Sequence, residues 1–260
     1  MTPDKAGAKA RAEGNGVAEA GHGGRPAARP LYVQVKELMR ARLSDGSWKP
    51  GRILPSEFEL AAEFGVSQGT VRKALDELAV ERLVVRRQGK GTFVAEHDED
   101  RALFHFLKLL ADDGGRALPE SRVLGVKVAR ANAAERAALA LEEGAKVWRI
   151  DRLRQLSGRP AILEQVAAPE ALFPGLGKEE PVPNTLYRLY EARYGVTVAR
   201  AEERLKAVAA GAAEAQALDI APGAPLLAID RIAFAIDGRP VEWRRSLCLT
   251  DRHHYLAELV

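Results

Sequence analysis

The sequence predicts two consecutive α+β domains, a small one with helices and a β-hairpin and a larger one with helices on an antiparallel sheet. Two observations predict them. Capped amphipathic helices and a hairpin pattern occupy the first third of the chain, and an internal repeat occupies most of the rest. With 260 residues, the chain is long enough for two separate cores, which we expect at residues 29–96 and 103–260.

The segments outside these two domains differ in composition. Residues 1–28 are rich in Gly, Ala and charge without apolar periodicity, which predicts a disordered tail. Residues 97–102 form a charged linker, and the first strand of the second domain is expected at residues 103–109. No apolar run could span a membrane and no signal peptide is recognisable, so we expect a soluble cytoplasmic protein.

Charge is distributed unevenly along the chain. The net charge is +3; residues 29–96 hold 12 Lys and Arg against 9 Asp and Glu, whereas residues 97–260 hold 23 against 24. The basic excess of the first domain favours nucleic acid as a partner, and the nearly neutral second domain favours a different one. Cys248 is the only cysteine, which excludes an internal disulfide and a cysteine-based zinc site.

Two helices are expected at the start of the first domain. The first spans residues 31–43, with an apolar inner face formed by Val35, Leu38, Met39 and Leu43. The second begins at Ser56, because a Ser followed three residues later by Glu59 forms a capping box.

A third helix follows after a tight turn. Gly65 supplies the backbone freedom of the turn, and Ser67 is a good N-cap. The apolar residues of the third helix share one stripe, formed by Val71, Leu75 and Leu78. Together the second and third helices predict a helix-turn-helix; the alternative is an ordinary helical hairpin in a core.

Residues 83–94 predict a β-hairpin next to these helices. Two short apolar runs flank a turn that contains two glycines, and the basic residues of its tip are Arg86, Arg87 and Lys90. A basic hairpin tip beside a helix-turn-helix is typical of a wing that lies along the phosphate backbone or the minor groove of DNA.

Residues 30–95 resemble the winged helix-turn-helix of the GntR family of bacterial transcription regulators. The segments KPGRILPSE, FGVS, TVRKALDEL and RRQGKGTFV occur in the family's order without gaps. The resemblance implies that this domain binds double-stranded DNA.

The residue types indicate which side chains would contact DNA. Helix N-termini with short hydroxyls bind phosphate, glutamine pairs with adenine, and arginine pairs with guanine. We expect contacts from the third helix, from the segment before the second helix and from the hairpin turn, namely Ser67, Gln68, Thr70 and Arg72; Arg52 and Ser56; and Lys90, Gly91 and Thr92. The alternative for Arg72 is an ordinary solvated charge.

Two positions depart from the common pattern of the family. GntR regulators often carry Arg where this chain has Phe58 and Gln68, so the family's usual operator sequence is not expected to apply. Phe58 is expected to pack instead of contacting DNA.

The second domain contains an internal repeat. Residues 131–152 match residues 210–231 at a spacing of 79, and Gly158-Arg159-Pro160 matches Gly238-Arg239-Pro240 at a spacing of 80. Each copy predicts a strand, an Ala-rich helix and two further strands, which together build one antiparallel sheet with an approximate two-fold. The turns are expected at residues 157–158 and 237–238, with the Asp-Gly pair of the second predicting a type I′ turn.

A further helix is expected between the two copies. Asn184 is the expected N-cap and Gly195 the expected end, with Leu186, Leu189 and Tyr190 facing inward. The free amides of its first turn could bind an anion.

The second domain resembles the UTRA effector-binding domain, which has a chorismate-lyase-like fold and marks the HutC subfamily of GntR regulators. The matching segments are RLRQLSGRP, NTLYRLYEARYGV, PGAPLL and DGRPVEWRRS. The resemblance implies a small anionic metabolite as effector.

The residues expected at the effector lie on the strands and at the start of the helix between the copies, namely Arg152, Arg154, Glu164, Asn184, Thr185 and Glu242. Guanidinium groups suit carboxylate or phosphate, and the glutamates would accept hydrogen bonds from the ligand. The alternative for Arg152 is a structural pair with Glu164. Arg244 and Arg245 are expected to be surface charges, because adjacent strand residues cannot share a face.

These patterns predict a transcription regulator, namely a metabolite-responsive repressor that binds a palindromic operator as a homodimer. The alternatives are an enzyme, or a DNA-binding protein without an effector, that uses the lyase-like domain for another purpose. No acid–base dyad or nucleophile–base pair stands at recognisable spacing, so we expect no catalytic residue and no cofactor. His253 and His254 lack further ligands nearby, so we expect no metal site.

Overall fold

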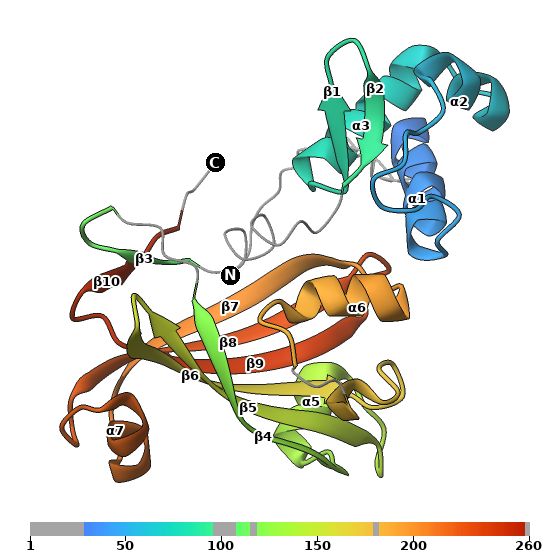
Figure 1. Ribbon diagram of the computed structural model, residues 1–260. Helices are drawn as coiled ribbons and strands as arrows, with labels where there is room; N and C mark the ends of the chain where they lie inside the picture. The colour runs from blue at the N-terminus through green and yellow to red at the C-terminus, as the bar shows by residue number, and fades with distance from the viewer. Residues whose placement is uncertain (1–28, 96–107, 115–118, 179–181, 258–260) are drawn as a thin grey trace, which may run out of the picture.

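The computed structural model describes residues 29–95, 108–114, 119–178 and 182–257. These residues form an N-terminal part, called the head (29–95), and a C-terminal part, called the body (108–257) (Figure 1). The expected tail, the expected linker and most of the expected strand at 103–109 lie outside the described residues. Among the residues that are described, no helix is both long and apolar enough to cross a membrane.

The head has the predicted order of elements. The three helices are α1 (Leu31–Ser44), α2 (Glu57–Phe64) and α3 (Gln68–Val80), and the hairpin is β1 (Val84–Arg87) and β2 (Gly91–Val94). The hairpin packs beside α3 (Figure 1). An isolated bridge between Ile53 and Phe93 attaches the loop before α2 to the hairpin.

The helix ends of the head follow from the predicted caps. The Ser56 hydroxyl accepts from the amide of Glu59 and the Glu59 carboxylate accepts from the amide of Ser56, which completes the capping box of α2. Gly65 ends α2 in the left-handed conformation, with φ 64°. Ser67 then caps α3 through the amide of Thr70. The helix-turn-helix is therefore encoded locally.

The core of the head contains the predicted stripe of α3 and a narrower face of α1 than expected. Val35, Met39 and Leu43 are buried, but Leu38 is 53% exposed, so its expected inward position is wrong. The three buried positions lie four residues apart along one line of the helix, and Leu38 falls beside that line.

The body is one six-stranded antiparallel sheet with the order β4-β5-β6-β9-β8-β7. The strands of the first repeat are β4 (Glu120–Arg130), β5 (Lys146–Leu156) and β6 (Arg159–Pro169); those of the second are β7 (Val198–Ala209), β8 (Pro225–Ala235) and β9 (Pro240–Cys248). The two copies meet at β6 and β9, where Gln165 pairs with Arg245, its equivalent in the repeat. The predicted approximate two-fold therefore passes between these two strands.

Helices cover both faces of this sheet. Helices α5 (Ala133–Leu139) and α7 (Ala212–Leu218) are equivalent in the repeat and lie on one face, while α6 (Leu186–Tyr194) lies on the other (Figure 1). The short helix η1 (Leu176–Lys178) packs against β4 and β5, and a separate pair of strands is formed by β3 (Leu109–Ala111) and β10 (His253–Tyr255).

The two repeat hairpins turn in different ways, and the predicted type I′ turn lies in the other copy. Ser157 and Gly158 form a two-residue turn with positive φ at both positions (52° and 76°), as type I′ requires. In the second copy only Gly238 has a positive φ, and the amide of Ala235 donates to the carbonyl of Arg239. The result is a three-residue loop that places Ile236 at its start.

Ile236 connects the body to the head. Its side chain is 5% exposed and packs in the apolar core of the head, and its carbonyl accepts from Arg40 Nη1 of α1 at 3.2 Å. An apolar residue at a hairpin tip would normally be exposed, so the burial of Ile236 depends on the head.

Gly177 allows η1 to pack closely against the sheet. A Cβ at this position would overlap the Trp148 ring and come within 2.7 Å of Val126 Cγ1. We predict that Gly177→Ala lowers the free energy of unfolding of the body by about 1–3 kcal/mol through overpacking, measured by urea unfolding with tryptophan fluorescence. Gly125→Ala is the control, because the nearest atom to its Cβ, Asp151 Oδ2, lies 3.9 Å away. Equal stability of the two variants would contradict the overpacking.

Candidate functional site

In the head, a carboxylate joins α2, α3 and the hairpin into one surface. Glu57 at the start of α2 accepts from Arg72 Nε of α3 at 2.9 Å and from Arg86 Nη2 of β1 at 3.3 Å. Arg86 also pairs with Asp76 of α3 at 2.9 Å. Arg72 remains more than half exposed, so its guanidinium group is oriented by Glu57 but open to a partner.

The residues expected to contact DNA all lie around this junction, on the loop before α2, the first turns of α3 and the hairpin turn. Most are exposed and Thr70 and Thr92 are half-buried; the exposed ones are Arg52, Ser56, Ser67, Gln68, Arg72, Lys90 and Gly91.

Some of these residues also stabilise the structure of the head. The hydroxyls of Ser56 and Ser67 cap α2 and α3, and Ser67 Oγ lies 2.9 Å from Thr70 Oγ1. Gly91 has φ 105°, and a Cβ there would approach Ile53 Cδ1 to 3.2 Å. The glycine is therefore required by the hairpin itself, whether or not its amide meets phosphate.

Phe58 does not pack into the head. It is 69% exposed, and α2 contributes Leu60 and Ala61 to the core instead. The expectation that Phe58 packs is therefore wrong. Its backbone position follows that of Glu57, at the end of α2 that lies beside α3 and the hairpin.

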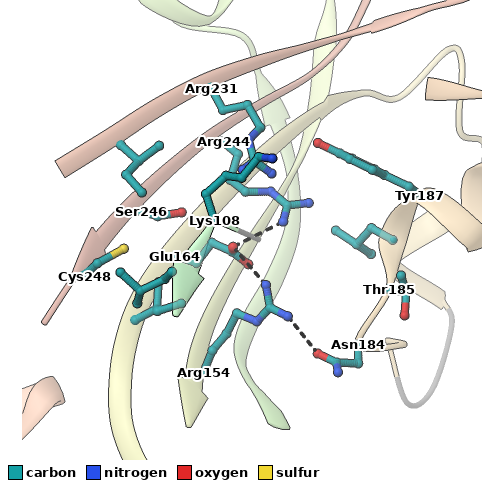
Figure 2. Close-up of a pocket in the computed structure, with 14 residues that line it drawn as sticks. Lys108, Arg154, Glu164, Asn184, Thr185, Tyr187, Arg231, Arg244, Ser246 and Cys248 are labelled. Carbon is teal, nitrogen blue, oxygen red and sulfur yellow. Dashed lines mark hydrogen bonds and ion pairs between the residues drawn. The ribbon is translucent and has the colours of Figure 1, made fainter. Parts of the chain in front are cut away.

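In the body, a cationic pocket lies between the sheet and the start of α6 (Figure 2). Its volume is about 570 Å³, including the solvent at its mouth. Larger grooves exist on the body, but this pocket is where buried charged side chains converge. Its polar lining residues are Lys108, Arg154, Glu164, Asn184, Thr185, Tyr187, Arg231, Arg244 and Ser246, and the others are Leu109, Ile162, Leu186, Ile229 and Cys248.

Glu164 is the centre of the charge network. It is 3% exposed, and both its oxygens are engaged. Arg152, its cross-strand partner on β5, donates to Oε2 from Nε at 2.9 Å and from Nη2. Arg244 Nη1 donates to Oε1 at 3.2 Å, and Arg154 Nη1 lies 3.6 Å from the same oxygen. Figure 2 shows Arg154 and Arg244 approaching Glu164 from opposite sides.

A second carboxylate lies behind the pocket. Glu242 is fully buried, and Arg244 donates to it twice, from Nε at 2.9 Å and from Nη2 at 3.0 Å. The hydroxyls of Tyr187 and Tyr190 donate to its two oxygens at 3.1 and 2.9 Å. Burial, then the neighbouring Glu242, raises the pKa of Tyr187 to about 12, so this hydroxyl stays a donor at neutral pH.

The helix that borders the pocket starts one residue later than expected. Thr185, not Asn184, is the N-cap of α6, and its side chain makes no capping hydrogen bond. Asn184 instead bridges to the sheet, because its Oδ1 accepts from Ser121 Oγ at 2.7 Å and from Arg154 Nη2 at 3.2 Å. The expectation that Asn184 caps this helix is therefore wrong.

The structure brings together four of the six residues expected at the effector. Arg154, Glu164, Asn184 and Thr185 line the pocket. Arg152 and Glu242 do not, because each is fully buried behind it in ion pairs. For Arg152 the alternative, a structural pair with Glu164, is confirmed; it also donates to the carbonyl of Asn184.

Sequence reasoning missed Arg231 and Arg244. The expectation of a surface position is wrong for Arg244, which is 7% exposed, while Arg245 is exposed on the opposite face. The strand alternation that separates the two should have placed Arg244 on the same face as Glu242, two residues earlier. Arg231 was detectable as the equivalent of Arg152 in the repeat.

Arg154 is the least compensated of the buried arginines at the pocket. It is 3% exposed, its Nε has no hydrogen-bond partner among the described residues, and its nearest carboxylate oxygen is 3.6 Å away. Burial lowers the pKa of Arg154 to about 10, against the attraction of Glu164, so the group is still charged at neutral pH. An anion bound in the pocket would compensate the charge of this guanidinium group.

Neither a metal site nor a reactive thiol emerges from the described residues. They hold no cluster of three or more His, Cys, Asp or Glu that could bind a metal ion. Cys248 is buried at the pocket wall, and burial raises the pKa of its thiol to about 12, which makes it a poor nucleophile at neutral pH.

Two protein families match the chain in consecutive segments. Residues 31–94 match the gntR family of bacterial regulatory proteins, and residues 115–254 match the UTRA domain. The chain is 31% identical to the HTH-type transcriptional repressor NagR of Bacillus subtilis over 88% of its length and 96% of the relative's. It is 34% identical to the histidine utilization repressor of Pseudomonas putida over 91% and 93%.

Solved structures agree with this division. The body resembles the ligand-binding domain of a GntR-family transcriptional regulator from Bordetella bronchiseptica, with 38% identity and a TM-score of 0.56 over 60% of this chain and 98% of that one. The chain also resembles PhnF from Mycobacterium smegmatis, with 25% identity and a TM-score of 0.53 over 87% and 99%.

Glu164 should stabilise the body. Burial alone would raise the pKa of this carboxyl, but Arg152, Arg244 and Arg154 hold it well below the ordinary value. The stabilisation is therefore present above the pKa of an unfolded Glu, about 4.3, and is lost as the pH falls below it. We predict that Glu164→Gln lowers the free energy of unfolding at pH 7 by about 3–5 kcal/mol, because it leaves buried guanidinium groups uncompensated.

Urea unfolding at several pH values measures this effect. The wild-type protein should lose its advantage over Glu164→Gln as the pH falls below about 4. Glu202→Gln is the matched control, because Glu202 pairs with Arg200 at the surface, where such pairs contribute at most about 1 kcal/mol. A pH-independent difference between wild type and Glu164→Gln would contradict the assignment.

Proposed function

Because the chain belongs to the GntR family of bacterial regulators, in the HutC-type subfamily that carries a UTRA domain, we propose that it is a metabolite-responsive repressor. Members of this family are transcription regulators, and the chain is a DNA-binding regulator and not an enzyme. Its effector is a small anion bound in the pocket of the body. The proposal depends on one observation: Arg154 is a buried and incompletely paired cation in a pocket of the body, and the body follows a DNA-binding head in the chain.

The head would bind DNA through α3 in the major groove. Gln68 and Arg72 are exposed near the start of α3, where a recognition helix contacts base edges. Lys90 at the hairpin turn would meet phosphate beside this groove. Since Glu57 already orients Arg72, DNA binding exchanges a protein carboxylate for a base or phosphate acceptor.

A homodimer on a palindromic operator is part of the proposal. One head of this size offers too small an interface for selective binding, so two heads on half-sites about one helical turn apart are expected. The protein would work in the cytoplasm and need no cofactor besides the effector.

The hairpin of β8 and β9 offers a route between effector and DNA. Arg231 and Arg244 lie on its two strands at the pocket, and Ile236 at its tip packs in the core of the head. An anion that shifts the two arginines would move a tip that the head encloses. Effector binding and DNA binding would then be coupled through one packed element.

Substitutions in the head test the DNA-binding surface. The test is a gel mobility shift with DNA from upstream of the chain's own gene. Arg72→Ala should weaken the binding free energy for this DNA by about 1–3 kcal/mol and reduce the preference for one base at the contacted position. Lys90→Ala should weaken binding to all sequences alike and reduce the salt dependence by about one phosphate contact. Lys127→Ala, on an exposed position of β4, is the control. Unchanged sequence-specific binding in both head variants would refute the assignment.

The coupling predicts a separate outcome for Ile236→Ala. A thermal-shift screen of organic carboxylates, phosphates and sugar phosphates should yield a compound that stabilises the protein and weakens its DNA complex. In Ile236→Ala, the compound should stabilise the body as before but weaken the DNA complex less, because the hairpin tip no longer fills the core of the head. Full release of DNA by this variant would exclude the hairpin route.

A further inference from the structure

The pocket offers many hydrogen-bond donors but few free acceptors. Its charged lining residues comprise one carboxylate and four cations, namely Glu164 and Lys108, Arg154, Arg231 and Arg244. A polyhydroxylated ligand needs acceptors as well as donors, because each hydroxyl that is buried without a partner costs about 1–3 kcal/mol. The number of free acceptor positions on the carboxylates Glu164 and Glu242 therefore decides what kind of ligand fits.

Glu164 has little acceptor capacity left for a ligand hydroxyl. A carboxylate has about four lone-pair positions. Arg152 donates two hydrogen bonds to Oε2 of Glu164, and Arg244 donates one to Oε1. Arg154 Nη1 lies 3.6 Å from Oε1 as an ion pair, so one position on this oxygen accepts no hydrogen bond from these arginines. A ligand hydroxyl at the remaining position would have to compete with the buried guanidinium group of Arg154.

Arg244 also removes Glu242 from ligand binding. It donates two hydrogen bonds to this carboxylate, and its guanidinium group lies 5.2 Å from the ring of Tyr187, between Glu242 and the pocket. Tyr187 and Tyr190 fill the remaining positions on the two oxygens. Glu242 is thus saturated, fully buried and outside the pocket lining.

The internal repeat shows why the pocket is short of acceptors. Arg231 is the equivalent of Arg152, and Arg244 is the equivalent of Glu164, 80 residues later. In the first copy Arg152, on the first strand of the hairpin, faces Glu164 on the second; in the second copy Arg231 faces Arg244. The substitution of a carboxylate by a guanidinium group at this position turns an ion pair into a pair of cations.

Carboxylates balance all but one of the arginine charges at and behind the pocket. Arg152, Arg154, Arg231 and Arg244 face three buried or half-buried carboxylates, which are Glu164, Glu203 and Glu242. One positive charge remains, and the least compensated group is Arg154. Lys108 adds a half-buried cation to the lining.

The remaining walls of the pocket are mostly apolar. Five residues contribute aliphatic or thiol surface, namely Leu109, Ile162, Leu186, Ile229 and Cys248. Opposite the arginines, only Thr185, Tyr187 and Asn184 carry polar groups (Figure 2). An apolar ligand body would gain from these walls, whereas several ring hydroxyls would find few acceptors, since the lining side chains add only the hydroxyl oxygens of Thr185, Tyr187 and Ser246 and the amide oxygen of Asn184.

We infer that the effector is a small organic anion, a carboxylate or a phosphate, whose body is apolar rather than polyhydroxylated. Arg244 determines this selectivity by occupying both Glu164 and Glu242. The inference rests on the proposed effector function of the same pocket and specifies its ligand class.

Ligand pairs that share a head group and a six-membered ring but differ in hydroxylation test the class on the full-length wild-type protein; glucose 6-phosphate also has a ring oxygen. The carboxylate pair is cyclohexanecarboxylate and quinate; the phosphate pair is cyclohexylmethyl phosphate and glucose 6-phosphate. Calorimetric titration should show at least about tenfold tighter binding of the hydroxyl-free member in one pair, which also identifies the head group. Equal or tighter binding of both hydroxylated members would overturn the inference.

The result also separates this inference from the proposed function. If glucose 6-phosphate and quinate each bind at least as tightly as their hydroxyl-free partners, and one of them releases DNA, the effector function is supported and the apolar class is refuted. Binding of none of the four anions, by a protein that still binds its own upstream DNA, would refute the anionic effector and the ligand class together while leaving the DNA-binding role intact.

Arg244→Ser tests the selectivity residue. It frees acceptors on Glu164 and Glu242, so the preference for the hydroxyl-free member should fall about tenfold. Arg244→Lys keeps a cation beside both carboxylates and should retain most of the preference, which a merely structural role would not predict if both variants are equally stable. If Arg244→Ser fails to fold, Arg244→Lys with a reversed preference would still refute the role of this charge. An unchanged preference in a folded Arg244→Ser would do the same.

Discussion

The body is organised around the buried carboxylate of Glu164. Three guanidinium groups converge on it from two strands, β5 and β9, and none of them is more than 9% exposed at the side chain. A single charge in such a place would be strongly destabilising, so each member of the network requires the others. Arg152 also holds the carbonyl of Asn184 and thereby the segment that leads into α6. The pocket exists because this network keeps the sheet and the helix start at a fixed separation.

The duplication of the body explains both its regularity and its specialisation. The helices and strands of the two copies follow the same order, and the two copies meet along β6 and β9. The pocket arises where the copies differ. Arg154 has Ala233 as its equivalent, and Glu164 has Arg244. The approximate two-fold thus brings a carboxylate and a guanidinium group together near the axis, and the excess cations collect on one side of it.

The second difference between the copies lies in their hairpin turns and produces a contact with the head. The first hairpin closes with two residues in the left-handed region, whereas the second has a three-residue loop that projects Ile236. Ile236 is buried only because α1 and the neighbouring part of the head cover it. One hairpin therefore carries two cations of the pocket and the contact with the head.

The sequence by itself determined the local elements. Capping boxes, a left-handed glycine and stripes of apolar residues act within one turn of chain, which is why the helix-turn-helix, its hairpin and the repeat were predictable. Only the tertiary structure decided where the charges lie. Strand order decides that Arg244 lies at the pocket and not on the surface. Helix α6, about 50 residues earlier in the chain, supplies the tyrosines that contact Glu242 in place of a ligand. Burial and pairing arise from such distant contacts, and no local pattern encodes them.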